Sequence, residues 1–79
     1  MGRGGKTRRL RVVSYIEGGN LDRWKRAADI HSDIYMENPL ALGIPSTRSV
    51  ARLLVELSNY GMVESKVVNG KVRVWRKIK

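Results

Sequence analysis

The first part of the chain repeats apolar residues at helical intervals. Leu10, Val13 and Ile16 recur three residues apart, a spacing that places side chains on one face of a helix. A first helix is therefore predicted from about Thr7 to Glu17. The Gly18-Gly19 pair that follows is expected to end it, because glycine readily adopts the left-handed conformation found at helix ends.

A second helix is predicted from Asn20 or Asp22 to about Met36, and Pro39 is expected to prevent its continuation. Its apolar face is expected to consist of Trp24, Ala27, Ala28, His31, Ile34 and Tyr35. Because His31 lies within this stripe, we expect a buried, hydrogen-bonded side chain with a structural role rather than a ligand or a catalyst. The apolar residues 40–45 are expected to fold back onto the core.

The clearest helical pattern extends from Ser46 to Tyr60 and predicts a third helix with Ser46 or Thr47 as its N-cap. Its apolar stripe comprises Val50, Leu53, Leu54 and Leu57, and the opposite side comprises Arg48, Arg52, Val55 and Asn59. Gly61 follows where helices commonly end in a left-handed glycine, and Met62 is expected to supply the apolar contact that accompanies such an end.

The chain ends in a predicted β-hairpin, with strands at Met62–Val68 and Lys71–Ile78. The Asn69-Gly70 pair between them favours a two-residue turn in which both residues have positive φ. In that register Lys66 lies opposite Arg73. Val63, Val67, Val72 and Val74 are then expected on the core face, with Lys66, Arg73, Trp75 and Glu64 on the other face.

The predicted element order is three helices followed by a two-stranded hairpin, which defines a small α+β fold of the winged-helix type. The chain has 79 residues, enough for one domain with a thin core. We expect a flexible basic arm at residues 1–6 and a winged helix-turn-helix domain at residues 7–79.

The charge is concentrated at the two ends of the chain. Its formal net charge is +9, yet residues 12–62 hold five basic and six acidic side chains. Cations confined to an arm and a hairpin favour a polyanionic partner. The alternative is a pair of solvated, frayed ends without a partner.

The third helix and the hairpin supply the candidate contacts to nucleic acid. Arg48 and Arg52 lie one turn apart and are expected to approach the bases, because arginine matches guanine edges. Hydroxyl donors at the helix start and basic residues of the hairpin are expected mostly on phosphates. These candidates are Ser46, Thr47, Ser49, Lys66, Lys71, Arg73, Arg76 and Lys77. Asn59, two turns along the helix, is a further candidate for contact with the backbone of the nucleic acid. On the alternative interpretation, Arg48, Arg52 and Glu56 only solubilise an amphipathic helix.

The N-terminal arm offers a second set of candidates for nucleic-acid contact. Arg3, Lys6, Arg8 and Arg9 lie there or at the start of the first helix. Disordered basic arms insert into an adjacent minor groove in other proteins. The alternative is a terminus that contacts nothing.

Several classes of function have little support in the residues. The chain has no cysteine and one histidine, which excludes thiolate zinc sites and disulfides. Asp29 and Asp33 lie one turn apart, but two carboxylates on a helix are weak evidence for a metal. No set of nucleophile, base and orienting residue is recognisable. We therefore expect no catalysis, no cofactor and no metal, and an intracellular, cytoplasmic location.

The segment Thr47–Leu57, followed by Gly61-Met62-Val63, resembles the recognition helix and first wing strand of the winged-helix superfamily. It is similar to the C-terminal winged helix of archaeal origin-recognition initiators and to small archaeal or viral regulators, although the chain lacks an ATPase module. A winged-helix protein of the small ribosomal subunit is a second resemblance. The first implies double-stranded DNA as partner, and the second implies RNA.

These observations together predict a non-enzymatic protein that binds duplex DNA in transcription or replication, and that is associated with the nucleoid. One alternative is an RNA- or ribosome-binding protein, in which the hairpin and arm matter more than the third helix because A-form RNA hides its major groove. Another is a protein–protein interaction module. A homodimer is compatible with the thin core, and no membrane association is expected.

Overall fold

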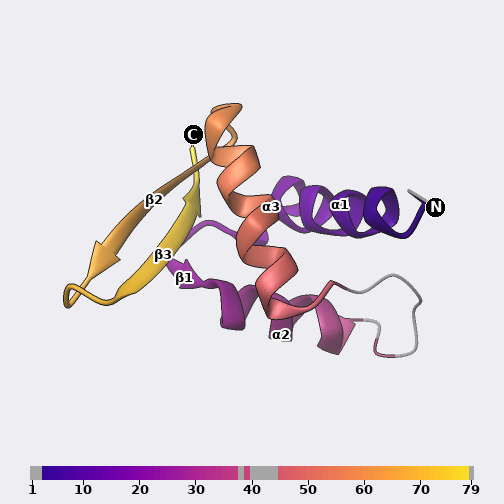
Figure 1. Ribbon diagram of the computed structural model, residues 1–79, viewed down its shortest axis with the longest axis horizontal. Helices are drawn as coiled ribbons and strands as arrows, with labels where there is room; N and C mark the ends of the chain where they lie inside the picture. The colour runs from indigo at the N-terminus through magenta and orange to yellow at the C-terminus, as the bar shows by residue number, and fades with distance from the viewer. Residues whose placement is uncertain (1–2, 38, 40–44, 79) are drawn as a thin grey trace.

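A computed structural model describes residues 3–37, 39 and 45–78, and of residues 3–7 it describes the backbone only. The fold is α+β: three α-helices pack on one side of a three-stranded antiparallel sheet (Figure 1). The elements are α1 (Arg3–Tyr15), the π-helical turn η1 (Ile16–Asn20), β1 (Lys25–Arg26), α2 (Ala27–Glu37), α3 (Thr47–Asn59), β2 (Val63–Val68) and β3 (Val72–Lys77). The order of strands in the sheet is β1-β3-β2.

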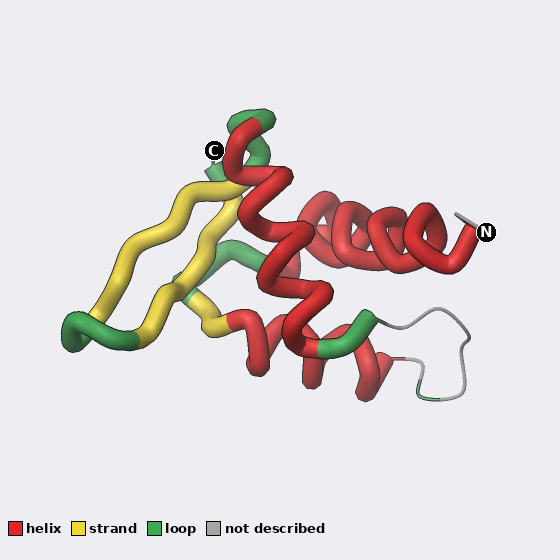
Figure 2. The backbone as a smooth tube through the Cα atoms, viewed as in Figure 1, coloured by secondary structure: helices red, strands yellow, loops and turns green. Residues whose placement is uncertain are grey.

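Helix α3 occupies the middle of the molecule. It contacts α1, α2 and β2, and in Figure 2 it crosses in front of the other two helices. The β2–β3 hairpin projects from one side of α3, while α1 extends away on the other side (Figure 1). The helix is therefore flanked by the N-terminal helix and by the hairpin.

The core lies between the helices and the sheet. Leu54 of α3 and Val63 of β2 are fully buried, and Trp75 of β3 is 3% exposed. The other members of the core are Val12, Tyr15, Ile16, Leu21, Ile30, Ile34, Val50 and Leu57. Burying a Val, Leu or Ile side chain stabilises the folded state by about 1.5–3 kcal/mol, so this one cluster accounts for most of the packing.

The ends of α3 agree with the sequence prediction. The Ser46 hydroxyl accepts the backbone N–H of Ser49 at 3.2 Å, which makes Ser46 the N-cap. At the other end Gly61 has φ +80°, and the Met62 N–H donates to the Leu57 carbonyl at 3.0 Å. This is the hydrogen bond of a Schellman motif, which requires the left-handed glycine.

The first helix begins and ends earlier than predicted. It starts at Arg3 rather than Thr7, so Arg3 and Lys6 belong to a helix and not to an extended arm, and Thr7 is not an N-cap. Gly4 and Gly5 each disfavour a helix by about 1 kcal/mol. For this reason the helix predicted from the sequence began after them. After Tyr15 the chain continues as the turn η1, in which Gly19 has φ +83°.

The second helix was predicted to begin too early, because Lys25 and Arg26 form a strand. They pair with Trp75 and Val74 of β3, so α2 begins at Ala27 and Trp24 is not helical. Such a pairing between distant segments leaves no periodic pattern in the sequence. The Asp29 carboxylate accepts the Arg26 backbone N–H at 3.3 Å, which helps to start the helix.

The buried face of α2 also differs from the prediction. Ile30 and Ile34 are its buried residues, whereas Tyr35 is 44% exposed. His31 is half-buried beside the Tyr35 ring, with 6.4 Å between the ring centroids, and is not the buried structural histidine that was expected. Of the apolar segment 40–45, Pro45 is fully buried and residues 40–44 lie outside the described part of the chain.

The hairpin turns at the predicted residues, but its loop is one residue longer and its register differs. Asn69 and Gly70 both have positive φ, at 55° and 69°, as predicted. Val68, however, pairs with Val72, so that Lys71 is left in the turn. A shift of one residue on one strand exchanges the faces of its side chains.

This register overturns the predicted faces of the sheet. Trp75 lies opposite Ser65 and belongs to the helix-side face, which also carries Val63 and Arg73. Lys66 lies opposite Val74 on the outer face. The predicted cross-strand pair of Lys66 and Arg73 is therefore wrong, because the two cations lie on opposite faces.

Candidate nucleic-acid interface

Ion pairs neutralise at least five of the cations whose side chains the structure describes. Five of the seven acidic residues bind a basic partner within 4 Å. The pairs are Arg9–Glu56, Arg23–Asp22, Lys25–Asp33, Arg26–Asp29 and Arg76–Glu64. Within the described residues, the cations without an acidic partner include Arg8, Arg48, Arg52, Lys66, Lys71, Arg73 and Lys77. These seven lie on α1, on α3 and on the hairpin, so the unneutralised charge is not spread evenly.

The outer side of α3 has the composition that its periodicity predicted. Arg48, Arg52 and Asn59 are exposed, and Val55 is half-exposed among them. The opposite side is anchored in the core by Val50, Leu54 and Leu57. Neither arginine bonds to another side chain in the described part of the molecule, so both guanidinium groups keep all their donors for a ligand.

The hydroxyl groups at the start of α3 differ in their contacts, since one caps the helix and the others keep a hydrogen for a ligand. Ser46 is engaged as the N-cap, and its hydroxyl also donates to the Ser49 hydroxyl at 3.1 Å. Thr47 is exposed. Of the three predicted hydroxyl donors, Thr47 and Ser49 thus retain a hydroxyl hydrogen that an anion can accept.

Helix α1 brings one further arginine to α3. Arg8, Ser49 and Arg52 line a cleft of about 180 Å³ between the two helices, together with Leu53 and Glu56. This places a predicted arm residue beside the predicted recognition helix, which the sequence alone did not indicate.

Arg9, the next residue along α1, already interacts with other residues of the protein. Its Nη1 donates to Glu56 Oε1 at 3.1 Å, and its guanidinium carbon lies 5.7 Å from the centre of the Tyr60 ring. The side chains of Arg3 and Lys6 lie outside the described part of the chain.

The basic residues of the hairpin do not form a single surface. Lys71 is exposed in the turn, and Arg73 lies on the helix-side face, where its Nη1 donates to the Ser65 hydroxyl at 3.1 Å. Lys66 and Arg76 lie on the outer face, where each places its charge 4.4 Å from the centre of the Trp24 ring. The β2–β3 cations therefore divide between the two faces of the sheet.

Two of the predicted hairpin contacts are placed away from the turn. Arg76 donates through Nε and Nη2 to Glu64 Oε2, at 3.0 and 2.8 Å, directly across the strands. Lys77 lies six residues from Lys71, about 20 Å along the strand, where its backbone N–H donates to the Leu21 carbonyl at 2.9 Å. Neither residue lies at the projecting end of the hairpin.

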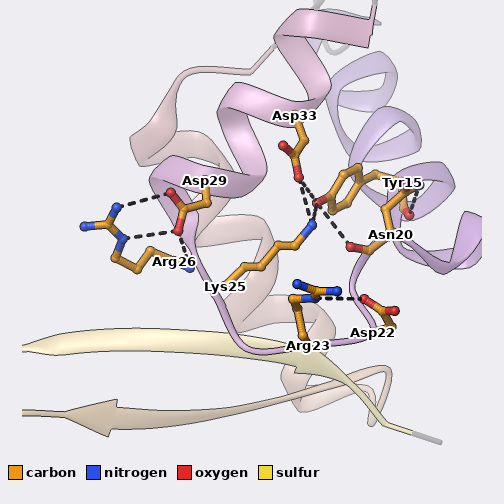
Figure 3. A network of polar contacts seen from close by, with 8 residues as sticks. All are labelled: Tyr15, Asn20, Asp22, Arg23, Lys25, Arg26, Asp29 and Asp33. Atoms are coloured by element: carbon orange, nitrogen blue, oxygen red, sulfur yellow. Dashed lines mark hydrogen bonds and ion pairs between the residues drawn. The ribbon is translucent and has the colours of Figure 1, made fainter.

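A polar network connects α1, β1 and α2 on the helix side of the sheet (Figure 3). The Tyr15 hydroxyl donates to Asp33 Oδ2, and Lys25 Nζ donates to the same oxygen at 3.0 Å and to the Tyr15 hydroxyl at 3.1 Å. Burial and the hydrogen bond to Asp33 raise the pKa of Tyr15 to about 12. The hydrogen bonds from Tyr15 and Lys25 lower the pKa of Asp33.

The two carboxylates of α2 that were weighed as a cation site are both engaged. Asp33 belongs to this network, and Asp29 binds the Arg26 guanidinium through both oxygens, which lowers the pKa of Asp29. Among the described residues no group of three potential metal ligands comes together. Asp29 and Asp33 therefore stabilise the position of β1 against α2.

No protein-family model, no curated protein and no solved structure matches this chain. None of the helices in the described ranges is long and apolar enough to cross a membrane.

Proposed function

We propose that this protein is a winged helix that binds duplex DNA without catalysis. The element order supports the proposal, because α3 leads through the Gly61 cap directly into the β2–β3 hairpin, as in the recognition helix and wing of that superfamily. Strand β1 is an addition to the two-stranded wing expected from the sequence. It pairs with β3 and so holds the base of the hairpin against α2.

The observation that carries the proposal is the distribution of cations without acidic partners. Arg48 and Arg52 lie exposed on α3, and Arg8 of α1 lines a cleft with Arg52. Lys71 and Arg73 lie on the hairpin that projects from the other flank of α3 (Figure 1). Neutralising DNA phosphates releases condensed counterions, which is the main source of affinity for duplexes. A protein that pairs five of its acids with other cations and leaves these cations unneutralised is suited to such a partner.

The dimensions of α3 agree with entry into the major groove. It has 13 residues, and only one side of it is needed for the core. The major groove is about 12 Å wide and admits an α-helix. Arg48, the second residue of α3, occupies the N-terminal part of the helix, from which recognition helices contact base edges. Lys71 and Arg73 contact the neighbouring phosphates, which position the protein without specifying sequence.

The test is a titration of labelled duplex DNA over a series of salt concentrations, with structured RNA as competitor. Neutralisation of three to five phosphates gives a slope of log K against log salt between about −3 and −5. Structured RNA competes less well, because A-form RNA offers α3 no accessible major groove. A slope shallower than about −2, or preferential binding of the RNA, contradicts the proposal. Absence of binding to both at ~150 mM salt favours a protein partner instead.

A further inference from the structure

The cleft between α1 and α3 presents two arginines without carboxylate partners. Arg8 and Arg52 line it, are exposed, and bond to no other side chain among the described residues. Glu56 also lines the cleft, but its Oε1 already accepts a hydrogen bond from Arg9. The cleft thus holds more positive than negative charge.

Two guanidinium groups beside one small cleft repel each other unless an anion lies between them. Guanidinium groups bind phosphate through paired, charge-assisted hydrogen bonds. Ser49 adds a neutral donor at the same place. Its hydroxyl oxygen accepts from Ser46, so its own hydrogen is free to point into the cleft. Two guanidinium groups and one hydroxyl group form a set of hydrogen-bond donors suited to a tetrahedral oxyanion.

We infer that this cleft binds one phosphate group of the DNA backbone, with Arg8, Ser49 and Arg52 as donors. The inference rests on the proposed function and changes one part of the sequence-based expectation. Arg52 was expected beside a base, but its place in the cleft assigns it to phosphate. Arg48 lies outside the cleft lining and remains the arginine available to bases. A phosphate bound between α1 and α3 on one side of α3, and the groove on its other side, then fix the orientation of α3 on the duplex.

The first experiment measures duplex binding by Arg8→Ala, Arg52→Ala and the double variant. Each single variant is expected to bind roughly tenfold more weakly, to a similar degree on every sequence, since a hydrogen-bonded charge on phosphate is lost. The double variant is expected to lose much less than the product of the two factors, because both residues hold the same phosphate. Arg23→Ala removes one equal charge elsewhere, from a residue paired loosely with Asp22 at 3.8 Å, and serves as the matched control.

A second measurement uses DNA in which single phosphates are replaced by neutral methylphosphonates. At one position the replacement is expected to weaken DNA binding by the wild-type protein about as much as Arg52→Ala does. Binding by the double variant is expected to be unaffected by the same replacement. If duplex binding is normal but Arg8→Ala and Arg52→Ala behave like Arg23→Ala, the cleft assignment is wrong and the proposed function stands.

Titration with inorganic phosphate separates the cleft from the proposed function. In NMR spectra, the Ser49 amide and the side-chain Nε signals of Arg8 and Arg52 are expected to shift and saturate, with the Ser49 shift lost in the double variant and retained in Arg23→Ala. If the protein binds no duplex but shows these shifts, the cleft is an oxyanion site and the proposed function is wrong. If phosphate leaves the Ser49 amide unshifted, the cleft assignment is overturned.

Discussion

Replacing Trp75 with alanine is expected to lower the free energy of unfolding by about 3–5 kcal/mol. Trp75 is 3% exposed and lies on the central strand of the sheet, opposite Lys25 on one side and Ser65 on the other. Its removal leaves a cavity between the sheet and the helices, which the backbone of a central strand cannot close. A domain of this length has a total stability of about 4–12 kcal/mol, so the loss affects a large share of it.

Urea denaturation of Trp75→Ala and Val67→Ala measures this effect with an internal control. Val67 lies on the same face of the sheet but is 49% exposed, and its replacement is expected to cost about 1 kcal/mol or less. The register predicted from sequence placed Val67 in the core and Trp75 outside it. A larger loss for Val67→Ala than for Trp75→Ala would support that register and contradict the one described above.

The largest effect on recognition is expected from Arg48→Ala. On a preferred DNA site, obtained by selection from random duplexes, the variant is expected to lose about 1–3 kcal/mol of binding free energy, or roughly 5- to 150-fold in affinity. On random DNA the loss is expected to be much smaller, because a base contact contributes little where no base is specified. Since Arg48 is exposed, its replacement leaves the fold intact.

Arg52→Ala and Arg23→Ala are the controls for this measurement. Arg52→Ala is expected to lose similar factors on preferred and random DNA, as a phosphate contact does, and Arg23→Ala is expected to lose little on either. Fluorescence anisotropy at fixed salt gives the affinities of the wild-type protein and of the three variants for both DNA types. Equal losses on both DNA types for Arg48→Ala would make Arg48 a phosphate contact and remove the basis for its role in sequence recognition.

Local interactions explain why the prediction of α3 was confirmed. The Ser46 cap, the apolar stripe from Val50 to Leu57 and the left-handed Gly61 each act within a few residues, so the sequence records them directly. The same holds for the positive φ angles of Asn69 and Gly70. The α+β class follows from these elements alone.

Features that depend on distant segments were not predictable in this way. The pairing of Lys25 with Trp75 that creates β1 joins residues 50 positions apart, and the hairpin register depends on burial of Trp75 rather than on the turn. The Asn-Gly turn is compatible with Lys71 inside or outside the paired strands. Tertiary burial decides between them, and a one-residue error exchanges the two faces.

The candidate site was predicted in part for the same reasons. Helical periodicity was sufficient to place Arg48 and Arg52 on the exposed side of α3. It gave no indication that Arg76 is bound by Glu64 across the strands, or that Lys66 and Arg76 lie over the Trp24 ring. Nor did it bring Arg8 to Arg52, because that approach depends on how α1 crosses α3.

On the proposed function, α3, its α1 flank and the end of the hairpin form the surface that binds duplex DNA. The most direct measurement is the set of backbone amide NMR shifts that change when duplex DNA is added to isotope-labelled protein. The changes are expected at Arg8, at residues 46–52 and at residues 71–73, with little change at Trp24, Lys66 and Arg76. Changes confined to Trp24, Lys66 and Arg76, with α3 unaffected, would contradict the account.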